Sequence, residues 1–591
     1  MVLTILAMLL SFTACTGSGK TDDGKKPSPT SAVTAEPTAA TVTGAASEPT
    51  QAPTEEPEPT AATEPTAVPE PTSTPEPTPT PEPEITAEPT PEAIVPPRII
   101  EMCIDSWFES DWNEEQNKSN GWYEYDFPRL SEDNEEYYPQ LAGAFKEYKD
   151  YKDSIKDSIL NDIAQAAKED EQYGLYNRDE SMCILRADSN LVSLRYDYSI
   201  YTGGVRGDYG TYGMCWDPST GERIELDSII KDKDAFIDIF FEKLESEISG
   251  EDLELYDPKE MRSYINTAFE AETLSFEVGY NYASVILNPY ETPINPGGQY
   301  IIDIPIKENE TLFNDKYLAI PKDYTVGFDA YDQLKTDIGN DGNVDTIKFY
   351  CDYVNEWDEF DNVTFYMNNL PIPKSYYFDE TCYGIAPVYI HTEDGDYIYI
   401  MVTFASEDTM TFAYRIDMNE NGYDENAQDN PWGTITQIAD GNLWDFDSKA
   451  SFDPMCMTMD CRRDMIGTNY IEATFIVGED GLPVQTSEIY SFISRYPLIT
   501  KKDLTLKEIS WVTDEITGDI VIPAGNTILM SYTDAESYVD CIWEADDTTH
   551  LVRIELEEER MYFDDGDYYS YFTIAGEEDP GELFDGIIYA D

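Results

Sequence analysis

The chain has 591 residues and carries 119 Asp and Glu against 37 Lys and Arg, a formal net charge of -82, with only two histidines. Nucleic-acid phosphates and anionic lipid surfaces attract proteins through Lys and Arg, so this charge excludes both as primary partners. The histidines, His391 and His550, are too far apart in sequence for a local zinc motif. The composition favours cations and basic proteins as partners and weighs against an enzyme.

The first residues combine an apolar run with a cysteine. Residues 2–14 are uncharged and match the apolar region of a signal peptide, which is shorter than the roughly 20 residues that span a bilayer. The run ends at Ala14-Cys15, and a small residue before cysteine resembles the lipobox of bacterial lipoproteins. We therefore predict a lipoprotein signal at 1–15, lipid attachment at Cys15, and an extracytoplasmic protein that touches the membrane only through this lipid.

Residues 16–97 have the composition of a stalk. Between Pro27 and Pro97 lie 19 of the 37 prolines and 12 Glu, without any Lys or Arg. Such a Pro/Thr/Glu-rich segment cannot build a core and favours extended polyproline II at about 3.1 Å per residue. We predict a disordered stalk that reaches on the order of 200 Å when extended, enough to cross the thick wall of a Gram-positive envelope.

From Arg98 the pattern changes to that of a folded α+β region. Apolar residues recur at spacings of three and four in residues 141–171, which predicts an amphipathic helix. Alternating apolar and polar residues predict strands at Leu191–Tyr201 and Tyr209–Trp216, and Asp227–Ile248 is predicted to be helical. We expect this α+β region to occupy residues 98–310.

Four sequence segments in this region occur in the same order as in a known family of proteins. They are YYPQLAGAFKEYKDYKDSIKDSILNDI at 137–163, YDYSIYTGGVRG at 196–207, WDPSTGERIELDSII at 216–230 and LNPYETPINPGGQYIIDIP at 287–305. They resemble the paired extracytoplasmic domains of the anti-sigma factor RsiV and of the N-terminal part of the peptidoglycan deacetylase PdaC. The resemblance implies an RsiV-like module and, as a partner, lysozyme, a small basic wall hydrolase. It transfers no catalytic residue, because the deacetylase chemistry belongs to a separate metal-dependent domain.

Residues 311–591 are predicted to be mostly β. Segments such as TIKFYCDY, PVYIHTEDGDYIYIMVTF, MTFAYRI and HLVRIELE place aromatic and branched residues between clusters of turn residues. A sandwich or a partial propeller fits this pattern better than a helical domain.

Two acidic loops in this region have the pattern of calcium-binding loops. Oxygen-bearing side chains recur at alternate positions, with glycine at the sixth, and such loops wrap hard cations that take six to eight oxygens. Neither loop has the complete pattern, because Gly339 takes the third position of the first and Gln428, in place of Glu, the twelfth of the second. An acidic turn whose glycine merely permits the bend is the alternative. We predict Ca²⁺ as the cofactor, with these ligands: Asp337, Asp341, Asn343 and Asp345 in the first loop, and Asp417, Asn419, Asn421 and Glu425 in the second.

Besides Cys15 the chain has eight cysteines, an even number that permits disulfides in an exported protein. Cys183 with Cys215 and Cys351 with Cys382 are the pairs that we expect.

These observations predict a wall-exposed lipoprotein with a binding role and no enzymatic activity. Its partner is expected to be a basic envelope protein such as lysozyme, or peptidoglycan, recognised for sensing or protection. The alternatives are a glycoside hydrolase of the cell wall that uses two carboxylates, and a passive adhesin or spacer. Trp107, Trp112 and Trp122 suit a sugar-stacking face in the hydrolase, but aromatic residues in β-rich domains usually belong to the core.

Overall fold

The computed structural model describes residues 98–589 except 114–117, 170–175, 204–206, 249–253, 255, 290, 294–297, 330–331, 354–358, 373–375, 405–408, 420–422, 424–429, 442–448, 546–547, 563–567, 575–576 and 578. The described residues all belong to one compact unit. The predicted signal and Cys15, the stalk, and the predicted ligands Asn421 and Glu425 lie outside them.

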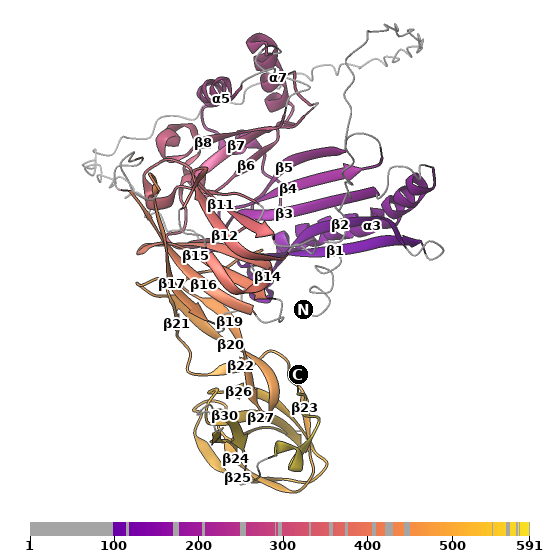
Figure 1. Ribbon diagram of the computed structural model, residues 1–591, viewed down its shortest axis with the longest axis vertical. Helices are drawn as coiled ribbons and strands as arrows, with labels where there is room; N and C mark the ends of the chain where they lie inside the picture. Colours follow the sequence, from indigo (N-terminus) through magenta and orange to yellow (C-terminus); the bar gives the residue numbers. More distant parts are fainter. Residues whose placement is uncertain are drawn as a thin grey trace, which may run out of the picture. The chain divides into compact units, whose positions relative to one another are not determined.

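The first sheet has the strand order β18-β1-β2-β3-β4-β5, and helix α3 runs along β1 and β2 (Figure 1). Its β2–β3 pair is parallel and its other pairs are antiparallel. The elements are β1 (Met102–Asn113), β2 (Lys118–Leu130), α2 (Glu132–Tyr137), α3 (Pro139–Glu169), β3 (Tyr176–Asp188), β4 (Leu191–Tyr201), β5 (Asp208–Trp216) and β18 (Ala450–Ser451).

Helix α3 confirms the predicted amphipathic helix, with one correction. Leu141, Phe145 and Ile163 are buried against the sheet as the spacing predicts. Tyr151, which the same spacing places on the apolar face, is exposed, and the next residue, Lys152, is buried instead. Lys152 forms an ion pair with Glu180 on β3, so a buried ion pair decides which residue of this helical turn faces the sheet.

A three-stranded sheet, β6-β7-β8, packs with α5 and α7 around the largest apolar cluster (Figure 1). The predicted helix at Asp227–Ile248 is in fact two helices, because Asp232 caps a new helix by accepting a hydrogen bond from the backbone N–H of Ala235. The elements are α4 (Leu226–Ile229), α5 (Lys233–Glu247), α7 (Pro258–Glu270), β6 (Phe276–Val278), β7 (Tyr282–Leu287), β8 (Tyr300–Pro305), η1 (Lys307–Leu312) and α8 (Asp315–Leu318).

The second large sheet has the order β10-β11-β12-β14-β15-β16-β17, with β9 and β13 on side branches. Its inward residues form a core rich in aromatic side chains. The elements are β9 (Tyr324–Gly327), β10 (Leu334–Thr336), η2 (Ile338–Asn340), β11 (Asp345–Tyr353), β12 (Phe360–Met367), β13 (Leu370–Pro371), β14 (Tyr376–Thr392), β15 (Gly395–Phe404), β16 (Thr409–Met418) and β17 (Gly433–Gly441).

The third large sheet has the order β19-β20-β22-β26-β27-β28-β24-β25 and encloses its own core. The elements are β19 (Met457–Met465), β20 (Gly467–Val477), β21 (Pro483–Gln485), β22 (Tyr490–Phe492), β23 (Pro497–Thr500), β24 (Leu504–Ile509), β25 (Ile516–Ile522), β26 (Thr527–Thr533), β27 (Tyr538–Ala545), β28 (Thr548–Glu555), η3 (Pro580–Glu582) and β31 (Phe584–Asp585), with the separate pair β29 (Glu557–Tyr562) and β30 (Tyr568–Thr573).

Contacts cross the predicted boundary between residues 310 and 311. Strand β18 pairs with β1 through Met102 and Ser451. The fully buried Arg186 pairs with Asp188 and donates hydrogen bonds to the carbonyl oxygens of Tyr317, at 2.9 Å, and Ala319, at 3.1 Å. The C-terminal region thus supplies a strand to the first sheet.

The structure is mostly β, with several sheets, and the predicted β-rich C-terminal region is confirmed. Assignment of residues 98–310 to an RsiV-like module stays a prediction, as do the domain boundaries. Among the described residues no helix is long and apolar enough to cross a membrane.

Neither predicted disulfide is formed among the described cysteines. Cys183 on β3 lies opposite Arg195, and Cys215 on β5 lies opposite Ser193, so strand β4 separates the two cysteines. Two strand spacings amount to about 9.5 Å, which exceeds the roughly 7 Å between Cα atoms that a disulfide bridges. Strand β12 separates Cys351 from Cys382 in the same way.

Candidate metal centre in the 337–345 loop

The first predicted calcium loop joins β10 to β11 through the short η2 turn. Gly339, Asn340 and Gly342 have φ angles of 74°, 53° and 102°, a left-handed conformation that glycine and asparagine adopt most readily. These residues turn the chain back on itself within a few positions. The turn brings together the side chains before, within and after it.

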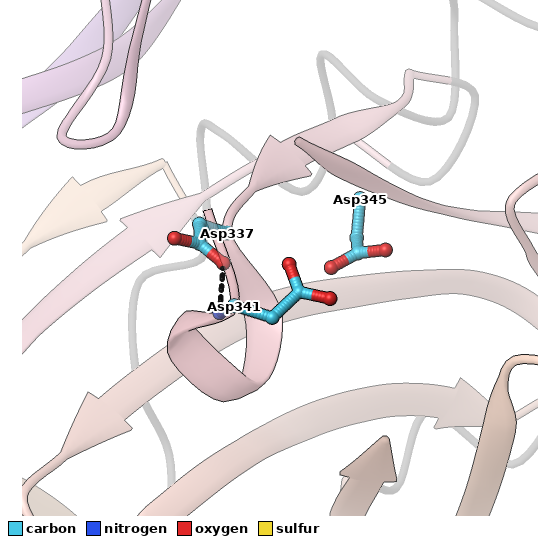
Figure 2. A group of neighbouring side chains, drawn as sticks. All are labelled: Asp337, Asp341 and Asp345. Atoms are coloured by element: carbon cyan, nitrogen blue, oxygen red, sulfur yellow. Dashed lines mark hydrogen bonds between the residues drawn. The ribbon is translucent and has the colours of Figure 1, made fainter. Parts of the chain in front are cut away.

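Three of the predicted ligands meet in this loop. Asp337, Asp341 and Asp345 each offer a carboxylate oxygen, and these oxygens lie within 4.8 Å of one another. The side chain of Asp341 points toward Asp345, while the carboxylate of Asp337 lies over the backbone nitrogen of Asp341 (Figure 2). Asp337 and Asp345 are only 4% and 3% exposed, and Asp341 is exposed. The group thus has two buried carboxylates and one that faces solvent.

Hydrogen bonds fix the carboxylates in place. Asp337 Oδ1 accepts bonds from the backbone N–H groups of Asp341, at 2.8 Å, and Gly342, at 3.1 Å. Asp345 accepts bonds from the Ile338 N–H, at 3.2 Å, and from Asn368 Nδ2, at 2.7 Å.

The fourth predicted ligand, Asn343, donates a bond of 3.1 Å from Nδ2 to Asp341 Oδ1. Its side-chain amide is therefore turned to a carboxylate of the cluster. The oxygen atoms of the loop are held mainly by neutral donors.

The electrostatics of the cluster favour a bound cation. Burial raises the pKa of Asp345 to about 6, with the neighbouring Asp341 adding to the increase, and burial also raises the pKa of Asp337. None of the three forms an ion pair with a described Lys or Arg. Lys307 instead bonds to the side-chain oxygen of Asn340 at 2.9 Å. N–H donors and, for Asp337, the charge of Lys307 offset part of the cost of burying these carboxylates, and a proton or a coordinated cation would offset more of it.

Residues far away in sequence support the loop. Asp396 on β15 accepts a bond of 3.0 Å from the Gly339 N–H through one oxygen. Its other oxygen accepts the Tyr389 hydroxyl at 2.6 Å and contacts His391 Nδ1 at 2.7 Å. Sequence patterns do not connect these residues with the loop, because only the pairing of β14 with β15 brings them to it.

The described part of the second predicted loop makes local contacts. Asp417 forms an ion pair of 2.9 Å with Arg415. Asn419 donates a bond of 2.6 Å from Nδ2 to the carbonyl oxygen of Pro431. A calcium site in this loop stays a prediction, since Asn421 and Glu425 lie outside the described residues.

A second carboxylate group, which the sequence analysis missed, lies on one face of the first sheet. Glu124 on β2 stands opposite Asp179 on β3, and Asp126 is two residues further along β2. Burial, with the charges of Asp126 and Asp179, raises the pKa of Glu124 to about 7. Lys449 pairs with Asp126 at 3.2 Å. The sequence of β2 could have indicated this group, because successive side chains of a strand point to opposite faces and residues 124 and 126 therefore lie on the same face.

The three tryptophans do not share one environment. Trp107 packs in an aromatic cluster with Tyr123 and Tyr125, and Trp122 donates a bond of 2.5 Å to Asp179. Trp112 is half exposed near the end of β1. Only Trp122 therefore lies next to the second carboxylate group.

No family model and no curated protein matches the chain. Two of the solved structures that match show weak similarity. One is a member of the DUF3298 family from Bacteroides fragilis, with 16% identity, 37% of this chain and 94% of that chain covered, and a TM-score of 0.26. The other is a DUF3298 family protein from Pseudomonas aeruginosa, with 10% identity, 38% and 97% covered, and a TM-score of 0.25. At these TM-scores the similarity carries no argument about function.

Proposed function

We propose that this chain is a cell-surface lipoprotein, anchored through Cys15, whose folded part binds a basic envelope protein of the lysozyme type without catalysing a reaction. The observation that carries the proposal is charge. From Arg98 to the end there are 105 acidic and 34 basic residues, an excess of 71 negative charges. Such a surface steers a cationic protein inward and raises its association rate.

Ion pairing within the structure leaves this excess in place. The described pairs mostly join a Lys or Arg to a neighbouring carboxylate, as Lys146 does with Asp150 and Lys507 with Asp519. Each such pair removes one charge of each sign, so the net charge is unchanged. Mobile counterions screen the remainder, and a cationic partner would displace some of them.

Calcium at the 337–345 loop is the second part of the proposal. Asp337, Asp341 and Asp345 supply hard oxygen ligands, which Ca²⁺ prefers over nitrogen or sulfur. A bound Ca²⁺ would neutralise the two buried carboxylates and fix the connection between β10 and β11. Its role in this proposal is structural.

Binding of lysozyme to the full chain tests the main proposal. Lysozyme on beads should retain the protein at about 50 mM and at about 200 mM salt, because a shaped interface persists when bulk charge is screened. Release at the higher salt would show that the interaction is only a non-specific attraction between opposite charges. Retention by peptidoglycan and not by lysozyme would identify the polysaccharide as the ligand.

A hydrolase is the second candidate, and the carboxylates on the first sheet favour it. Glu124 and Asp179 occupy opposite positions on adjacent strands, and retaining glycosidases use a close pair of carboxyls. Glu124, with its pKa near 7, has the protonation of a general acid, and Asp179 is its neighbour. Release of reducing sugar from wall fragments, abolished in Glu124→Gln, would support this function over binding.

A further inference from the structure

Strand β25 forms an open edge of the third sheet. It is the last strand in the sheet order and pairs only with β24 among the described residues. Alternate N–H and C=O groups on its outer side therefore point to solvent. An edge of this kind pairs with an extended segment of another chain, which adds to the sheet as a new strand.

The sequence of β25 does little to block such pairing. Proteins protect open edges with proline and with charged residues, lysine above all. The strand, ITGDIVI, contains no proline or lysine, and its one charged residue, Asp519, is already paired with Lys507 at 2.7 Å. Ile516 and Val521 are each 54% exposed along this strand.

The turn that leads into β25 presents further apolar side chains. Trp511 is 52% exposed and Val512 is 92% exposed. The turn is well ordered, because the Ser510 N–H donates to the Glu515 carbonyl oxygen at 2.9 Å and the Ser510 hydroxyl accepts bonds from the next residues. These bonds fix the backbone that carries the exposed apolar side chains next to the start of β25.

Charge indicates which kind of segment fits this edge. The hairpin of β24 and β25, residues 504–522, carries Lys507 against Glu508, Asp514, Glu515 and Asp519, a net charge of -3, and Arg553 on the adjacent strand β28 pairs with Asp514 and reduces the local excess to -2. A second copy of the chain would bring like charge to this surface, and the chain's own residues 27–97 are too rich in proline to donate a row of N–H groups.

We infer that the β24–β25 hairpin docks an extended, basic segment of a partner protein, which pairs with β25 and covers Trp511, Val512 and Val521. This inference rests on the proposed binding of a basic partner and names the surface that binds it. Lysine side chains of the added strand would face Glu515, which forms no ion pair among the described residues, and would compete with Lys507 for Asp519, while its apolar side chains would pack on the exposed valines.

The test uses the full chain and a nine-residue peptide that alternates Lys and Val, with fluorescence anisotropy as the readout. Val521→Lys should weaken peptide binding by about tenfold or more, because it puts a charge on the edge and removes an apolar contact. Val484→Lys is the matched control, since Val484 is 49% exposed and lies on β21 of the same sheet. The control should bind as the unchanged protein does.

Two further measurements separate strand pairing from simple attraction. A version of the peptide with all of its backbone nitrogens methylated keeps its charge but has no backbone N–H to donate from either edge, and it should bind about tenfold more weakly. Val512→Ser should weaken binding of the unmodified peptide without altering the fold, because Val512 is almost fully exposed.

Equal loss in Val521→Lys and Val484→Lys, or unchanged binding of the methylated peptide, would overturn the inference. Sedimentation that shows self-association through Val521 would assign the edge to a second copy and overturn it too. Lysozyme bound equally by Val521→Lys would refute the docking surface and leave the proposed function standing. Failure to bind any basic protein would refute the proposed function itself.

Discussion

Replacement of Asp345 by asparagine tests the cation site through the sign of a stability change. The native pKa of Asp345 is about 6, against about 3.9 for an ordinary Asp. The native state therefore binds the proton more tightly than the unfolded chain does. Wild-type stability that is present at low pH is lost as pH rises from about 4 to about 6, and the loss approaches 3 kcal/mol, because each unit is worth about 1.4 kcal/mol.

The variant Asp345→Asn does not lose stability as the pH rises, because its amide carries no charge that would be buried. The variant loses one of the two hydrogen bonds that Asp345 accepts from Ile338 N–H and Asn368 Nδ2, which costs about 1 kcal/mol of stability. In a chelator at pH 7.5 the variant should thus be more stable than the wild type by about 2 kcal/mol. With free Ca²⁺ at about 100 times its dissociation constant, the wild type gains about 2.7 kcal/mol and the order reverses.

Scanning calorimetry of the full chain, in chelator and in calcium, measures both effects. The exposed Glu479→Gln is the control for loss of one negative charge, and calcium should stabilise it as much as the wild type. If Asp345→Asn unfolded before the wild type in chelator and gained as much from calcium, the reasoning would be refuted.

The remaining predictions concern other parts of the structure. The wild type should lose about 2 kcal/mol of stability, after screening by solvent, as the pH rises from about 4 to 7, and Glu124→Gln should not show this loss. Urea unfolding across this pH range measures the difference, and equal pH profiles of the two proteins would contradict the prediction. Arg186→Met should cost about 3–5 kcal/mol, because Asp188 stays buried without its partner; a smaller loss in chemical denaturation would mean that water reaches Asp188. Gly213→Ala should prevent folding, because its Cβ would lie 1.5 Å from a backbone oxygen of β6, whereas Gly143→Ala in α3, with open space, should stabilise by up to about 1 kcal/mol; soluble yield and circular dichroism compare the two.

Local patterns predicted the elements well where one face of an element is apolar. Strand β4 begins at Leu191 and ends at Tyr201, as the alternation predicts, and β5 differs from its predicted range by one residue. The meeting of Asp337, Asp341 and Asp345 could also be predicted, because the three aspartates and the glycine of this loop are close together in sequence and one turn suffices to gather them.

Contacts between distant segments could not be predicted from periodicity. Nothing near Ser451 indicates that it pairs with Met102, about 350 positions earlier. The burial of Lys152 depends on Glu180, and the approach of Asp396 to Gly339 depends on the pairing of strands. The disulfide prediction was wrong for the same reason, since the number of cysteines does not reveal the strand that separates Cys183 from Cys215.

The central claim, that an anionic folded part recognises a basic protein, is tested most directly by titration calorimetry of lysozyme into the full chain, beside lysozyme whose lysines have been succinylated. Unmodified lysozyme should bind with a defined stoichiometry that persists at moderate salt, and the succinylated form, with its charge reversed, should not bind. Absence of heat with unmodified lysozyme, or equal binding of both forms, would contradict the account.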